Sequence, residues 1–152
     1  GKNVYVKVPV CNSKGIFTGK VIKELNSKNI KLNITAVYDL KQVVNILKNI
    51  NKKTEVIISI FAGRMADVGK DPIPVFNKSI LISKKFKNVK ILWASTREAY
   101  NYYQASKLNC HLITIPPGII EKIENFGKNS EALTIETVKG FLIDSKKSNF
   151  KI

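Results

Sequence analysis

The chain has 152 residues, 44% of them hydrophobic, which is enough for one core in a single domain spanning residues 1–152. No apolar run approaches the ~20 residues that cross a membrane, and no signal peptide opens the sequence, so we expect no membrane partner. The formal charge of +15 would suit nucleic acid, but the lysines are spread along the chain and a general bias toward Lys, Asn and Ile explains them. We therefore expect no nucleic-acid partner.

Cysteine and histidine are too few and too scattered for a metal or redox site. Cys11 and Cys110 have no metal-ligand spacing, and His111 is the single histidine. Two scattered cysteines are typical of a reducing cytoplasm, where thiols stay free. We expect no metal, a cytoplasmic location and a structural role for His111.

Apolar runs alternate along the chain with stretches of helical periodicity. The predicted strands are residues 4–10, 32–37, 56–61, 91–94 and 112–115. The predicted helices are residues 16–25, 40–47 with Asp39 as N-cap, 74–86, 96–108, 117–125 and 134–146, with a loop at 62–72. This order predicts an α/β fold with a parallel sheet.

The loop after the first strand, CNSKG, lacks the glycine pattern of a nucleotide-binding fold. A (β/α)₈ barrel instead collects polar residues at the C-terminal ends of several strands, which is where they occur in this sequence. The pattern therefore favours barrel-type βα units.

Lys7 is a cation in the middle of the apolar strand VYVKVPV. A buried ammonium must be paired, hydrated or neutral, and a neutral lysine is a nucleophile that forms Schiff bases with carbonyl compounds. The alternative is a lysine at a sheet edge or in a cleft that keeps its charge in water.

Residues of like parity in the later strands predict a polar pocket around Lys7, because alternate side chains of a strand share a face. The pairs are Asn33 with Thr35, Ser59 with Phe61, Trp93 with Ser95, and Leu112 with Thr114. The alternative for each hydroxyl is a hydrogen bond within the sheet.

Arg64 and Arg97 are the only arginines, and each follows an apolar strand. A helix opening at Ser95–Arg97 would point free N–H groups at the pocket, and two guanidinium groups could then hold a phosphate. The alternative is a surface ion pair with Asp67 or Glu98.

The segments VYVKVPV, LNITAVYDLKQV, IISIFAGRMADVG, ILWASTREAYN and LITIPPGII, in this order, resemble the transaldolase family of class I Schiff-base aldolases. The resemblance implies that Lys7 forms the Schiff base with a ketose donor. It implies substrate contacts from Asn33, Thr35, Ser59 and Phe61. It assigns the phosphate to Arg64, Ser95 and Arg97. No cofactor is implied, because the Schiff base is itself the electron sink.

The resemblance also implies transfer of a dihydroxyacetone unit between sugar phosphates in the pentose phosphate pathway. Fructose-6-phosphate aldolases resemble the same segments but carry tyrosine at Phe61, so phenylalanine favours transaldolase. An aldolase-type lyase and a basic non-enzymatic binding module remain the alternatives.

In the family, Lys7 belongs to the fourth barrel strand, so the five units correspond to strands four to eight of a partial TIM barrel plus a C-terminal helix. A complete barrel needs at least roughly 200 residues. Because the acid–base carboxylates belong to the first three units, we expect little or no activity from this chain. Because the sheet edges would be open, we expect a homo-oligomer, with a dimer covering them.

Overall fold

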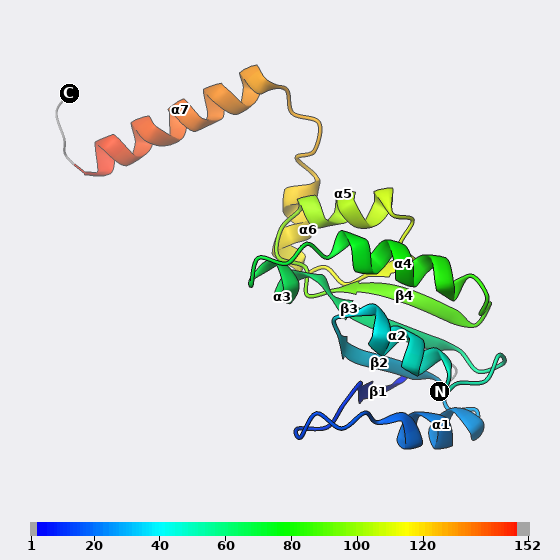
Figure 1. Ribbon diagram of the computed structural model, residues 1–152. Coiled ribbons are helices and arrows are strands. Elements are labelled where there is room, and N and C mark those ends of the chain that lie inside the picture. Colours follow the sequence, from blue (N-terminus) through cyan, green and yellow to red (C-terminus); the bar gives the residue numbers. More distant parts are fainter. Residues whose placement is uncertain (1–2, 149–152) are drawn as a thin grey trace.

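The computed structural model describes residues 3–148, and its centre is a five-stranded parallel sheet (Figure 1). The strands lie in sequence order and are β1 (Val6–Pro9), β2 (Leu32–Val37), β3 (Val56–Phe61), β4 (Val89–Ala94) and β5 (Leu112–Ile113). The sheet is open, with β1 and β5 at its edges. This order of βα units confirms the prediction of a partial (β/α)₈ barrel.

Helices connect the strands, and two more follow β5. They are α1 (Gly19–Ser27), α2 (Leu40–Leu47), α3 (Ala62–Ala66), α4 (Ile73–Ser83), α5 (Tyr100–Lys107), α6 (Pro117–Ile123) and α7 (Ser130–Lys147). Helix α4 packs on β4, and α2 packs between α4 and α1. Helix α7 extends away from the body (Figure 1). No helix within residues 3–148 is long and apolar enough to span a bilayer.

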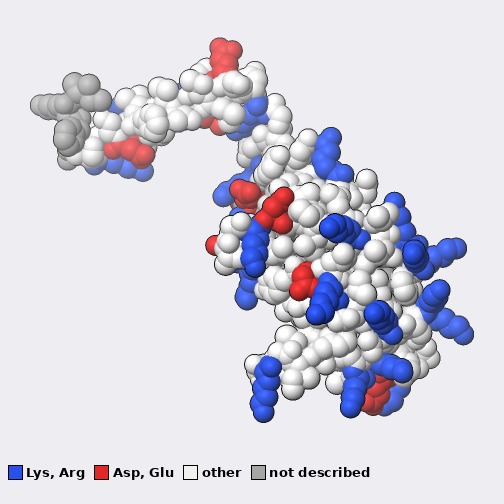
Figure 2. Space-filling model, viewed as in Figure 1, with Lys and Arg blue, Asp and Glu red and all other residues white. Residues whose placement is uncertain are grey.

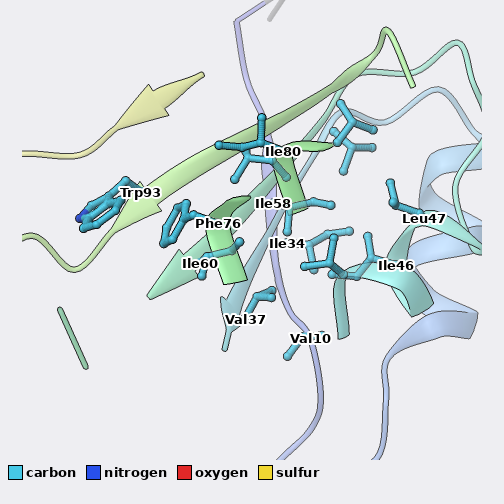
Figure 3. Close-up of a cluster of buried hydrophobic side chains, with 14 of the residues drawn as sticks. Val10, Ile34, Val37, Ile46, Leu47, Ile58, Ile60, Phe76, Ile80 and Trp93 are labelled. Atoms are coloured by element: carbon cyan, nitrogen blue, oxygen red, sulfur yellow. The ribbon is translucent and has the colours of Figure 1, made fainter. Parts of the chain in front are cut away.

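The core lies between the sheet and its covering helices (Figure 3). Ile34, Ile58 and Ile60 are fully buried on the helix-facing side of adjacent strands. Phe76 of α4 stacks on Trp93 of β4, with ring centroids 4.5 Å apart. Strand alternation thus sends one set of side chains to the helices and leaves the other set for the opposite face.

Several predicted boundaries were wrong, for local reasons. Helix α1 starts at Gly19 because Phe17 forms an antiparallel bridge with Cys11. The predicted loop 62–72 contains the short helix α3, in which Gly63 O accepts from Asp67 N. Helix α7 starts at Ser130, not at 134, because the Asn129 side chain caps it.

The N-cap predicted for α2 is confirmed. Asp39 Oδ1 accepts from Gln42 N at 2.7 Å, and the Gln42 side chain accepts in return from Asp39 N at 3.3 Å. This capping box fixes the chain immediately after β2, at the edge of the sheet where the polar residues gather.

Candidate functional site

A pocket of about 210 Å³ lies over the face of the sheet opposite the one on which α4 packs. Its lining comes from the four strands β1 to β4 and from the residues that follow β4 and β5: Lys7, Asn33, Thr35, Ser59, Phe61, Leu92, Ala94, Ser95 and Thr114. The family resemblance assigned a role in one site to six of these residues, and the parity of the predicted strands added Thr114. The structure brings them together because the strands are parallel and in register, with Lys7 beside Asn33 and Ser59 beside Leu92.

Lys7 lines this pocket from the edge strand β1. Its apolar strand is not buried, because within residues 3–148 only β2 pairs with β1, and Lys7 is exposed. Lys7 belongs to none of the four ion pairs formed within residues 3–148. The arrangement is the cleft-edge alternative, with a lysine that reaches both the pocket and solvent.

Asn33 and Ser59 form a polar pair at the floor of the pocket. Ser59 Oγ donates to Asn33 Oδ1 at 2.6 Å, which links β3 to β2 beside Lys7. The Asn33 amide group keeps its two N–H donors for other partners. Thr35 Oγ1 is buried on the same face and finds no hydrogen-bond partner in the described part of the chain. A hydroxyl-rich ligand would supply such a partner.

Phe61 lines the pocket and lies beside Arg64. Its ring meets Tyr38 edge-on at 5.9 Å between centroids, and the Arg64 guanidinium carbon lies 5.8 Å from it. Neither arginine lines the pocket itself. Both are exposed in the connections that follow β3 and β4, at the pocket's end of the sheet.

Arg97 is paired with Asp67, which was the alternative for this arginine. Its Nη2 lies 2.7 Å from Asp67 Oδ2, and its Nε also donates to the carboxylate. Hydrogen bonding to Arg97 lowers the pKa of Asp67, and charge attraction from Arg64 lowers it further. Two cations and one carboxylate therefore form a cluster that retains a net positive charge.

The predicted helix opening at Ser95–Arg97 was wrong, since α5 begins at Tyr100. Ser95 has a left-handed backbone with φ of +65°, which breaks the helical path. The Asn101 side chain then accepts from the N–H groups of Arg97 and Glu98, at 2.9 and 3.3 Å. The N–H groups of Arg97 and Glu98 are thus already used, and any anion site there depends on the side chains.

Comparison with known proteins decides the family of this chain. The family model described as transaldolase/fructose-6-phosphate aldolase matches residues 1–152. The chain belongs to this family. It resembles a probable transaldolase from Nitrosopumilus maritimus at 32% identity over 148 residues, which cover 90% of this chain and 63% of that relative.

Two further probable transaldolases match at lower identity. The protein from Herpetosiphon aurantiacus is 27% identical over 93% of this chain and 59% of its own length. The protein from Thermoplasma volcanium is 28% identical over 97% of this chain and 60% of its own length. The chain thus spans about three fifths of the length of these curated relatives.

In this transaldolase-family chain, the prediction of which β4 side chains face the pocket was half wrong. Trp93 faces the core, whereas Leu92 and Ala94 face the pocket. Ser95 still reaches the pocket because its left-handed backbone reverses the alternation. Thr114 also lines the pocket, although the family resemblance assigned it no role. Its parity with Leu112 was the sequence signal for it.

The predicted structural role of His111 in this family member agrees with its contacts. His111 Nδ1 accepts a hydrogen bond from Ile91 N at 3.1 Å. The imidazole thereby links β4 to the segment that precedes β5. Partial burial and the neighbouring Lys90 lower the pKa of His111, which favours its neutral, accepting form. Cys11 and Cys110 are both free thiols.

Proposed function

We propose that the pocket binds a ketose phosphate and that Lys7 forms a Schiff base with its carbonyl carbon. The observation that carries the proposal is the meeting of Lys7 with Asn33, Thr35 and Ser59 in one pocket that has two arginines beside it. The donor class is a sugar phosphate of the sedoheptulose 7-phosphate type. The acceptor is an aldose phosphate, as in the pentose phosphate pathway.

The reaction uses the Lys7 amine as nucleophile and the carbonyl group of the donor as electrophile. The Lys7 amine adds to the ketose carbonyl and loses water, and retro-aldol cleavage of the resulting iminium releases an aldose phosphate. The electron pair of the broken bond stays on the lysine-bound three-carbon unit as an enamine. That enamine then attacks the acceptor aldehyde, and water hydrolyses the imine to free Lys7 and the new ketose phosphate.

The other residues take binding roles in this proposal. Asn33, Thr35 and Ser59 orient the donor hydroxyls and the carbinolamine, and Phe61 covers one side of the chain of carbons. Arg64, Ser95 and Arg97 hold the phosphate away from the reacting carbons. Binding energy gained at the phosphate then helps to position the carbonyl group against Lys7.

The residues of the pocket are poorly suited to proton transfer. Among the described residues that line the pocket, none is an aspartate or a glutamate. General acid–base catalysis commonly contributes 10²–10⁴-fold to a rate. We therefore propose that this chain by itself condenses with a ketose phosphate but turns over slowly or not at all.

A fructose-6-phosphate aldolase-type lyase is the second candidate, because the matching family includes both activities. The two differ in what the enamine attacks, an aldehyde in the transferase and a proton in the lyase. Phe61 favours the transferase because its ring carries no hydroxyl to hold water beside the enamine. Product analysis with and without an aldose phosphate acceptor separates the two activities.

Self-association is also proposed, because the two edge strands have unpaired backbone groups. Within residues 3–148, strand β1 pairs only with β2, and β5 pairs only with β4. Open edges recruit further strands. Size-exclusion chromatography that gives a stable monomer at micromolar concentration would contradict a dimer.

The free thiols of Cys11 and Cys110 fit the reducing cytoplasm proposed as the location of the protein.

The test of the Schiff base is reduction with borohydride in the presence of fructose 6-phosphate, followed by peptide mass analysis. We expect one adduct, on the peptide that contains Lys7, and no adduct in Lys7→Ala. Lys90→Ala is the matched control, because Lys90 lies opposite Ile57 on the same face of the sheet but does not line the pocket. An adduct that survives Lys7→Ala, or none in the unmodified chain, contradicts the proposal.

A further inference from the structure

The end of the sheet at which the strands begin, opposite the end with the pocket, is strongly basic. Three connections enter β2, β3 and β4 at this end, namely residues 28–31, 48–55 and 84–88. Glu55 is their single acidic residue. Their eight lysines are Lys28, Lys31, Lys48, Lys52, Lys53, Lys84, Lys85 and Lys87. We call these three connections the basic edge, and Figure 2 shows its lysines along the right of the molecule.

The connections on the pocket side have no such excess. They contain four cations and four acids, which are Lys14, Arg64, Lys70, Arg97, Asp39, Asp67, Asp71 and Glu98. A composition bias toward lysine acts on both edges of the sheet equally. It therefore does not explain why one edge is neutral and the other carries eight lysines.

Asparagine side chains tie the three connections of the basic edge into one frame. Asn26 Oδ1 at the end of α1 accepts from Asn51 N at 2.7 Å. Asn88 Nδ2 donates to Asn51 O at 2.9 Å and to Thr54 O at 2.6 Å. The lysines between these anchors are consequently held as one continuous surface.

Most of this positive charge has no internal counter-charge. Lys28 pairs with Glu24 and Lys31 with Glu55. The other six lysines of the basic edge form no ion pair within residues 3–148. All six are exposed, so this surface presents six ammonium groups to solvent.

A hollow of about 200 Å³ lies within this surface, between the ends of α1 and α2. Lys23 and Lys48 line it together with Asn26. Asn26 is buried, and its Nδ2 finds no acceptor among residues 3–148. Two ammonium groups and an unused N–H donor together suit the binding of one phosphate oxygen.

We propose that the basic edge binds the phosphate backbone of a nucleic-acid duplex, without regard to sequence. Lysines act as point charges on phosphates and do not read bases. The one aromatic residue of the three connections, Phe86, is half-buried, and Lys52 Nζ lies 5.8 Å from its ring centre. It offers no open platform for an unpaired base, which favours a duplex over a single strand.

The test measures binding of the full chain to a fluorescent duplex of roughly 20 base pairs between 50 and 200 mM salt. The patch variant carries Lys→Gln at 48, 52, 53, 84 and 87. The control variant carries Lys→Gln at 14, 20, 41, 70 and 78, which are exposed lysines elsewhere, so both variants lose the same charge. Circular dichroism and thermal unfolding establish that both variants fold.

We expect the patch variant to bind at least about tenfold more weakly at 50 mM salt. The slope of its log affinity against log salt concentration should be less steep, by the equivalent of up to about four phosphate contacts. The control variant and Lys7→Ala should bind like the unmodified chain, which separates this site from the pocket. Equal loss in the patch and control variants overturns the proposal, as does absence of duplex binding at 50 mM salt. Binding to phosphatidylserine vesicles but not to the duplex, through the same five lysines, overturns it in favour of a membrane surface.

Discussion

The guanidinium of Arg97 is held by the carboxylate of Asp67, with Nη2 and Oδ2 2.7 Å apart. Nε donates to the same carboxylate, so one fork of the guanidinium is fully used. A carboxylate and a phosphate bind this fork in the same way. A sugar phosphate that used this fork of Arg97, as proposed, would therefore have to displace Asp67.

Asp67→Asn is expected to tighten the binding of inorganic phosphate and of fructose 6-phosphate. The exposed ion pair is weak, so we expect a gain of about two- to fivefold, measured by isothermal titration calorimetry. Asp71→Asn is the control, since it removes the same charge from the same connection without touching Arg97. An equal gain in both variants indicates a general charge effect, and weaker binding in Asp67→Asn means that Asp67 orients Arg97.

Gly63→Ala is expected to separate α3 from the segment that follows β4. A Cβ atom at Gly63 would lie 1.7 Å from the Ser95 carbonyl oxygen, so the backbone must shift. We expect a loss of about 2 kcal/mol or more in urea unfolding, together with weaker phosphate binding. Gly118→Ala is the control, because a Cβ there meets nothing within 4 Å. Unchanged stability in Gly63→Ala would contradict the close approach.

Glu55 is expected to stabilise the fold in a pH-dependent way. Hydrogen bonding from Lys31, and then from Tyr5, lowers the pKa of Glu55 below its ordinary value. Its contribution is therefore full above about pH 4.3, the ordinary value for glutamate, and is lost as the pH falls through the lowered pKa. Urea unfolding of the unmodified chain and of Glu55→Gln should differ at pH 7 and converge toward pH 3.

The control for Glu55 is Glu121→Gln, a substitution of an exposed glutamate on α6 that lies outside all four ion pairs of residues 3–148. Its stability relative to the unmodified chain should not vary with pH. A difference for Glu55→Gln that stays constant from pH 7 to pH 3 would show that the carboxylate charge is not what stabilises these strand starts.

Phe76→Ala is expected to cost about 3–5 kcal/mol, because the ring is fully buried against Trp93. A double-mutant cycle with Trp93→Leu should give a coupling of about 0.5–1.5 kcal/mol from the stacked rings. Phe141→Ala is the control, since that ring is 68% exposed on α7 and its loss should cost less than about 0.5 kcal/mol. Absence of coupling would mean that Trp93 does not face α4.

The sequence was most informative where a strand has one polar face. Asn33 and Thr35, like Ser59, stand out against aliphatic neighbours, so alternation placed them correctly beside Lys7. Strand β4 has no such contrast, because Ile91, Leu92, Trp93 and Ala94 are all apolar. Alternation alone could not say which of its faces meets the helices, and Trp93 was put on the wrong one.

Two further features depend on interactions that linear patterns do not contain. The late start of α5 results from the left-handed Ser95 and from the Asn101 side chain, which acts backward on residues 97 and 98. The basic edge combines lysines from three separate connections. Read along the chain these lysines look evenly spread, and only the parallel sheet brings them to one side.

Strand β1 has a consequence for the dynamics of the molecule. Its four residues form a ladder with β2 alone, and three of the four are exposed. Segments with few buried contacts and a one-sided ladder open at a lower free energy than the centre of a sheet. The amides around Lys7 should accordingly exchange with solvent deuterium before those of β3, so that the amine proposed as the nucleophile lies on a strand less protected than the centre of the sheet.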